Sequence, residues 1–96
     1  MYAITLQDAP SELPERLRQD AEQRFRRTLE RSLGDPDTVL AAYRAWQNAE
    51  DSASEEISAD ELSLAKRWMT AVVRARNEGL REAGETEAWF EIKLLR

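Results

Sequence analysis

The chain has 96 residues, with 14 lysines and arginines against 19 aspartates and glutamates, so its formal net charge at pH 7 is −5. It contains no histidine and no cysteine, which excludes the commonest general base, thiol nucleophiles, disulfides and zinc sites of the Cys/His type. The length predicts a single compact domain over residues 1–96. With no apolar run of the roughly 20 residues that a membrane span needs, and no secretory layout at its start, we expect a cytoplasmic protein without membrane contact.

The first predicted element is a short strand. Residues 2–7 place Tyr2, Ile4 and Leu6 on one side and smaller or polar residues on the other. This alternation is typical of a half-buried strand.

A long helix should follow, with Ser11 as its N-cap and Leu33 near its end. Its apolar residues recur every four positions, and each step of four overshoots a full turn by roughly 40°. The apolar stripe therefore winds around the helix. Acids and arginines four residues apart are expected to pair on its surface; these pairs are Glu12/Arg16, Asp20/Arg24 and Glu22/Arg26.

The tripeptide Gly34-Asp35-Pro36 predicts the end of one helix and the start of the next. Glycine closes the first helix, aspartate caps the second, and proline is tolerated in the first helical turn. We expect a short second helix that ends near Ala49 and packs antiparallel to the first.

The stretch from Ser58 to Ala83 carries the clearest helix signals. Ser58 and Glu61 form a capping box, and Gly84 is a typical closing residue. Apolar residues cover an arc of roughly 140° on this helix; they are Leu62, Ala65, Trp68, Met69, Val72, Val73 and Leu80. A helix this broadly apolar is expected to lie under other elements.

Residues 87–95 alternate again and predict a second strand, with Phe90 and Ile92 on one side and Trp89 and Leu95 on the other. Because isolated strands leave their backbone groups unpaired, the two strands should pair with each other, in a direction that the sequence leaves open. The predicted fold class is therefore α+β and mainly helical: a three-helix body with short N- and C-terminal strands pairing, in the order β-α-α-α-β.

A row of bases on the third helix is a candidate anion-binding surface. Arg67, Arg74 and Arg81 recur every seven residues, roughly 10.5 Å apart along the axis, with Lys66 beside them. Such a row suits a phosphate backbone or an acidic partner. The alternative is an ordinary solvated face.

Arg76 falls inside the apolar arc of the same helix, which predicts a buried charge. An unpaired charge there would be costly, so we expect a neutralising acid from the preceding loop or the last strand, or else a ligand or partner.

The acidity of the chain is concentrated in residues 34–62, which hold eight acids and a single base. Its candidate partner-binding residues are Glu50, Asp51, Glu55 and Glu56. They suit imitation of a nucleic-acid backbone toward a basic groove, or simply a solubilising loop. A calcium loop is disfavoured, because glutamate stands where its sixth position needs glycine.

Trp89 and Leu95 are the second candidate for contact with a protein. A two-stranded sheet has open edges, and an exposed indole beside such an edge is typical of an interaction site. The alternative is that a helix also covers this side. Pairing of the edges of two copies would give a four-stranded sheet and a symmetric homodimer.

The sequence shows no catalytic constellation, no Gly-rich phosphate loop, and no metal or cofactor motif. We therefore expect no enzyme but a small protein-binding protein, an adaptor or a regulator or inhibitor, that acts through the Trp89 edge or the acidic segment. The alternatives are a nucleic-acid-associated protein that uses the arginine row, or an acidic inhibitor that mimics nucleic acid.

Overall fold

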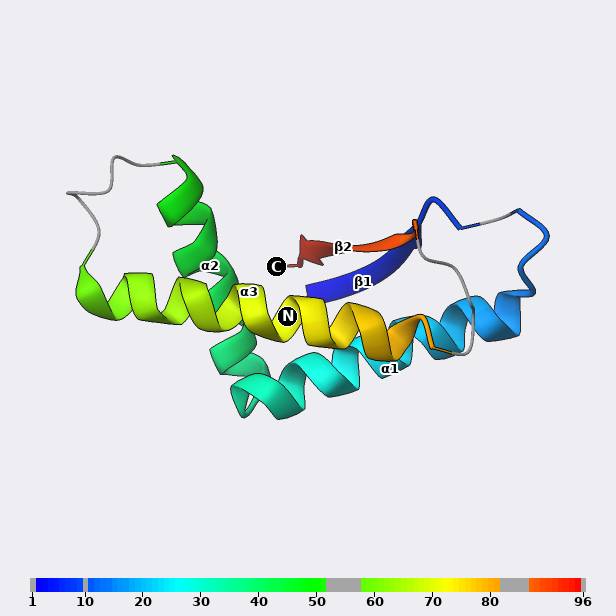
Figure 1. The fold of residues 1–96 in the computed structure, drawn as a ribbon, viewed down its shortest axis with the longest axis horizontal. Helices are drawn as coiled ribbons and strands as arrows, with labels where there is room; N and C mark the ends of the chain where they lie inside the picture. The colour runs from blue at the N-terminus through cyan, green and yellow to red at the C-terminus, as the bar shows by residue number, and fades with distance from the viewer. Residues whose placement is uncertain (1, 10, 52–57, 82–86, 96) are drawn as a thin grey trace.

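The computed structural model describes residues 2–9, 11–51, 58–81 and 87–95. Its elements follow the predicted order and are β1 (Tyr2–Gln7), α1 (Glu15–Leu33), α2 (Pro36–Asp51), α3 (Ala59–Gly79) and β2 (Trp89–Leu94) (Figure 1). The two strands form an antiparallel sheet, in which Ile4 lies opposite Ile92. The predicted α+β class is therefore confirmed, and the direction of strand pairing is settled.

The start of α1 differs from the prediction. The helix begins at Glu15 after Pro14, and no side chain caps it. The Ser11 hydroxyl instead contacts the carboxylate of Glu12 at 3.3 Å. The predicted end at Leu33 is confirmed, and Gly34 follows with a φ of 112°, a conformation that glycine adopts without strain.

The other two helices start as their caps predict. The Thr38 backbone N–H donates to Asp35 Oδ1 at 2.7 Å, and the Glu61 N–H donates to Ser58 Oγ at 3.1 Å. The end of α3 was predicted too late, because the helix stops at Gly79. The predicted closing residue Gly84 lies outside the described residues.

The second helix extends to Asp51, beyond the predicted end at Ala49, and it does not pair antiparallel with α1. Figure 1 shows α2 running steeply across α1 and α3, which lie side by side. The sheet lies over the pair formed by α1 and α3, and α2 stands beyond one end of the sheet. Among the described residues, no helix has the length and apolarity needed to cross a membrane.

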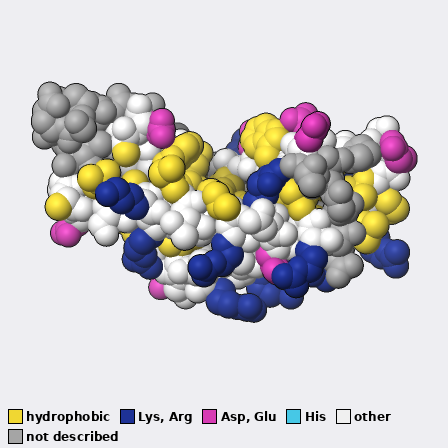
Figure 2. Space-filling view, in the orientation of Figure 1, with side chains coloured by type: hydrophobic (Ala, Val, Ile, Leu, Met, Phe, Trp, Pro, Cys, Tyr) yellow, Lys and Arg dark blue, Asp and Glu magenta, His cyan; other side chains and the backbone are white. Residues whose placement is uncertain are grey.

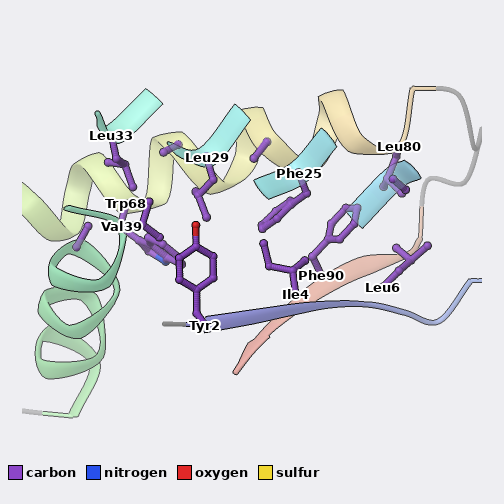
Figure 3. Close-up of a cluster of buried hydrophobic side chains, with 14 of the residues drawn as sticks. Tyr2, Ile4, Leu6, Phe25, Leu29, Leu33, Val39, Trp68, Leu80 and Phe90 are labelled. Carbon is purple, nitrogen blue, oxygen red and sulfur yellow. The ribbon is translucent and has the colours of Figure 1, made fainter. Parts of the chain in front are cut away.

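The core lies between the sheet and the helices (Figure 3). Tyr2, Ile4 and Leu6 point from β1 toward α1, as the strand pattern predicts. The rings of Phe25 and Phe90 stack with centroids 4.3 Å apart, which joins α1 to β2. Burial of these side chains from both chain ends fixes the sheet on the helices.

Candidate functional site

An apolar groove runs between β2, α2 and α3, with a volume of about 560 Å³. Figure 2 shows it as the hollow at the upper margin, with hydrophobic side chains on both sides. Its lining residues are Tyr43, Trp46, Trp68, Met69, Val72, Val73, Trp89, Phe90, Glu91 and Ile92.

The wall that α3 contributes was expected to be covered. Instead, Val73 is 58% exposed and Met69 is 54% exposed, although Trp68 on the same helix is buried. The reason is the direction of α2, which crosses α3 near one end of α3. The apolar residues on the next turns of α3 therefore remain exposed to solvent. Exposed apolar side chains that share a hollow are typical of contact sites.

Aromatic rings form the floor of the groove where α2 meets α3. The ring of Tyr43 lies 5.2 Å from that of Trp68 and 6.0 Å from that of Trp46, measured between centroids. The Tyr43 hydroxyl accepts a hydrogen bond from Gln47 Nε2 at 3.2 Å. The floor is therefore held in place by packing within and between the two helices.

Trp89 lies on the opposite side of β2 from Phe90, as predicted, and it is 47% exposed, so the alternative of a covering helix does not hold at this residue. Its indole Nε1–H donates to Asp8 Oδ2 at 2.6 Å, which fixes the ring across the end of β1. Leu95 directly follows β2 and is 42% exposed. Both predicted contact residues are thus available at the surface.

The outer edge of β1 is covered by α1. The Leu6 N–H donates to Glu22 Oε2 at 2.8 Å, and the Leu6 carbonyl oxygen accepts from Arg18 Nη1 at 2.8 Å. The Tyr2 carbonyl oxygen accepts from Arg26 Nη2 at 3.0 Å. These side chains occupy the groups with which another strand would pair.

The outer edge of β2 is different. Because Leu6 directs its backbone groups away from β2, the facing residue Phe90 must direct its own away from β1, and so must Ile92 and Leu94. Within residues 2–9, 11–51, 58–81 and 87–95, no hydrogen bond reaches these outer groups. Phe90 and Ile92 also line the apolar groove, so the open edge and the groove are one site.

A second surface, the basic furrow, lies between α1 and α3. It consists of two adjoining hollows that share Ser32 and Arg74. Its basic side chains are Arg24, Arg27, Arg31, Lys66, Arg67 and Arg74. Figure 2 shows lysine and arginine side chains gathered along this side of the molecule. The only acids among the described lining residues are Asp20 and Glu78, so the furrow is positive although the chain is negative.

Some of the basic side chains in and beside the furrow are paired with nearby acids or backbone oxygens. Arg24 Nε lies 2.8 Å from Asp20 Oδ2, as predicted, and Arg81 Nη2 lies 3.0 Å from Glu78 Oε2. Arg67 Nη2 donates to the Leu33 carbonyl oxygen at 3.4 Å. Of the predicted row, Arg67 and Arg74 lie on α3 and line the furrow, and Arg67 also serves the end of α1. Arg81 lies beyond the end of α3, outside the lining of the furrow, and pairs with Glu78.

Arg76 is half-buried, which corrects the prediction of a buried charge. Its Nε donates to the Ala88 carbonyl oxygen at 3.0 Å. The side chain therefore reaches from α3 to the residue that precedes β2. The three methylene groups of an arginine side chain let its guanidinium reach a polar partner at a distance from its own Cα, which a projection of Cα positions does not reveal.

Most of the acidic segment lies outside the described residues. Glu55 and Glu56 are not described, and neither is the side chain of Asp51. Glu50 is exposed near the end of α2. The described residues thus place one acidic side chain of this candidate at the surface.

Sequence reasoning missed two parts of these surfaces. It assigned Met69 and Val73 to the core. Leu80 falls between them on the helical projection and is buried, so their place in the apolar arc gave no signal of exposure. It also treated the arginines of α1 as a solvated face. Arg24, Arg27 and Arg31 follow one another at three- and four-residue spacing, which predicts a common side of the helix.

Among the described residues, no group of three or more acidic, histidine or cysteine side chains could hold a metal ion. Comparison of the chain with protein-family models, with curated proteins and with solved structures finds no match.

Proposed function

We propose that this chain is a small, non-catalytic, cytoplasmic protein that binds another protein through the apolar groove and the open edge of β2. The observation that carries the proposal is the coincidence of these two features. The free backbone groups of Phe90 and Ile92 border the same hollow as the exposed side chains of Met69 and Val73. Strand edges bind by main-chain hydrogen bonds, and neighbouring apolar surface selects the side chains.

The asymmetry of the two edges supports this proposal. Proteins usually protect open strand edges, and here α1 supplies Arg18, Glu22 and Arg26 to the edge of β1. The edge of β2 has exposed apolar side chains beside it instead. An adaptor or a regulatory protein needs such a surface and no catalytic group.

The test compares affinity capture from the native host by the wild-type chain and by Val73→Glu. Val73 is exposed, so a charge there should leave folding intact while disfavouring an apolar partner. Asn77→Glu is the matched control, since Asn77 is exposed on the same helix and lines neither the apolar groove nor the basic furrow. Loss of the captured proteins with Val73→Glu alone supports the proposal; identical captures by both variants contradict it.

The basic furrow favours a second candidate function, association with nucleic acid. Lysine and arginine side chains from both α1 and α3 line the furrow, so it has more positive charge than the arginines of α3 alone would give it. The furrow offers serine, threonine and arginine side chains but no aromatic ring among its described residues. This suits contact with a phosphate backbone rather than stacking on unpaired bases.

Titration of duplex DNA at two salt concentrations tests this candidate. Binding should weaken steeply with salt, because each neutralised phosphate releases counterions. Arg74→Gln should reduce both the affinity and the salt dependence, since Arg74 lines both hollows of the furrow. Arg16→Gln, an exposed position outside the furrow, is the control. Absence of binding at low salt removes the candidate.

A further inference from the structure

The open edge of β2 limits how another strand can pair with it. Its outward backbone groups belong to Phe90, Ile92 and Leu94. Ala88 lies two residues before Phe90, so its backbone groups point to the same outer edge, but its carbonyl oxygen already accepts the hydrogen bond from Arg76. An added strand therefore finds free partners from Phe90 onward.

A second copy of β2 can use all of these positions in one two-fold register. In an antiparallel pair around a two-fold axis, the residue on the axis lies opposite itself. With the axis at Ile92, Phe90 lies opposite Leu94 of the second copy, so every outward residue meets an outward residue. About six backbone hydrogen bonds result, because each such pair exchanges two.

The same register matches the charges on the solvent-facing side of the sheet. Glu91 and Lys93 are both exposed there. With the axis at Ile92, Glu91 lies opposite Lys93 of the second copy, in a position where side chains approach closely. An axis at Glu91 or at Lys93 would set two like charges against each other instead.

The exposed apolar residues of this side also fall opposite one another. An axis at Ile92 places Trp89 opposite Leu95 of the second copy, and the symmetry repeats this contact. These residues are 47% and 42% exposed in the single chain. Aromatic side chains opposite aliphatic ones are among the favourable cross-strand pairs. The four solvent-facing residues from Trp89 to Leu95 thus match the same four residues of a second copy, in charge and in apolar contact.

The groove supplies the remaining contact area. A six-residue strand edge is only about 20 Å long, whereas specific dimers bury roughly 800 Å² on each chain. A strand that pairs with β2 lies along the groove, within reach of Met69 and Val73 on the opposite wall. Covering this wall removes apolar surface from water, which strand pairing alone does not achieve.

We propose that the apolar groove is occupied by a second copy of this chain. The two β2 strands pair antiparallel about an axis at Ile92 and form a four-stranded sheet in the order β1-β2-β2-β1. The inference rests on the proposed function, because it names the partner of the same groove. An extended segment of a different protein is the competing occupant.

Exchanging the two charges tests this register. Glu91→Lys and Lys93→Glu each replace both opposite-charge pairs by like-charge pairs, so each variant should self-associate about tenfold more weakly than the wild type. Mixed together, the two variants should form a heterodimer at least as tight as the wild-type dimer, because both pairs become attractive again. Sedimentation equilibrium of each chain and of the mixture measures this. Glu12→Lys, an exposed position on the first turn before α1, controls for net charge.

Single cysteines test the same geometry without relying on charge. The chain has no cysteine of its own, so an introduced thiol is unique. Glu91→Cys chains mixed with Lys93→Cys chains should give a disulfide-linked heterodimer under mild oxidation, since directly opposed residues lie within disulfide reach. Either variant alone should cross-link more slowly, because its thiols are then diagonal neighbours.

The outcomes separate this inference from the proposed function. A wild-type chain that stays monomeric up to the highest concentration it tolerates overturns the dimer. So does a dimer in which neither charge variant weakens association and no heterodimer is preferred. If the monomer still captures a host protein that Val73→Glu loses, the proposed function stands with a different occupant. If neither self-association nor such capture occurs, both fall.

Discussion

Phe90 packs against Gly79 so closely that no side chain fits between them. A Cβ atom at Gly79 would lie 2.9 Å from Phe90 Cζ and 3.1 Å from the Ala21 carbonyl oxygen. The last residue of α3 therefore touches both β2 and α1. This contact holds β2 beside α3, and with it one wall of the apolar groove.

Gly79→Ala should destabilise the fold. Overpacking costs about 1–3 kcal/mol, which exceeds the up to about 1 kcal/mol that alanine gains over glycine in a helix. Urea unfolding followed by circular dichroism measures the difference. Asn77→Ala, an exposed position on the same helix, is the control and should not lose stability. An unchanged midpoint for Gly79→Ala would contradict the close contact.

Glu22→Ala should loosen the protected edge of β1. The variant removes the acceptor of the Leu6 N–H, a hydrogen bond whose net contribution is about 1 kcal/mol. Hydrogen exchange at the Leu6 amide should accelerate, whereas Glu22→Gln keeps an acceptor oxygen and should preserve most of the protection. Gln23→Ala, exposed beside it, should have no effect. Equal exchange in the wild type and in Glu22→Ala would show that α1 does not protect this edge.

Asp35 should make the start of α2 sensitive to acid. Its carboxylate accepts the Thr38 N–H, which lowers the pKa of Asp35. A lowered pKa in the folded state means that this stabilisation is present above the unfolded pKa of about 3.9 and is lost as pH falls through the folded value. Asp35→Asn keeps a capping oxygen without a titratable group. As the pH is lowered from 5, its free energy of unfolding should therefore fall less than that of the wild type. Identical acid curves would count against this role.

The sequence predicted those features of the fold that depend only on residues close together in the chain, such as helix caps and the two sides of a strand. Asp35 and Ser58 cap their helices because the partner N–H groups lie three residues away and no tertiary contact competes. Strand alternation likewise predicted that Trp89 lies on the opposite side of its strand from Phe90, but it left open whether a helix covers that side. The Ser11 cap was wrong because Pro14, with its fixed φ, offers a later start that needs no side chain.

The surfaces depend on how the helices cross, which local patterns do not encode. Whether Val73 is buried depends on where α2 meets α3. Whether Arg27 and Arg74 share a furrow depends on which sides of α1 and α3 face each other. The sequence therefore predicted Trp89 beside an open edge, but neither the groove next to it nor the contribution of α1 to the basic surface.

Tyr2 should couple stability to alkaline pH. Burial raises the pKa of Tyr2 most, and the hydrogen bond from its hydroxyl to Glu30 adds to the increase. Arg26, whose guanidinium lies 4.5 Å from the centre of the ring, opposes the shift without cancelling it. The folded chain therefore keeps the phenolic proton at pH values where the unfolded chain has lost it.

Because the folded pKa is the higher one, the contribution of Tyr2 is complete below the unfolded value of about 10 and declines above it. Urea unfolding at a series of pH values above 9 should show a falling free energy in the wild type and a flatter curve in Tyr2→Phe. Tyr43→Phe is the companion variant, because it leaves Tyr2 as the sole tyrosine, and tyrosinate absorbance then reports Tyr2 alone. Ionisation of that tyrosine near pH 10 without unfolding would mean that the Glu30 contact and the burial of the ring do not hold the proton.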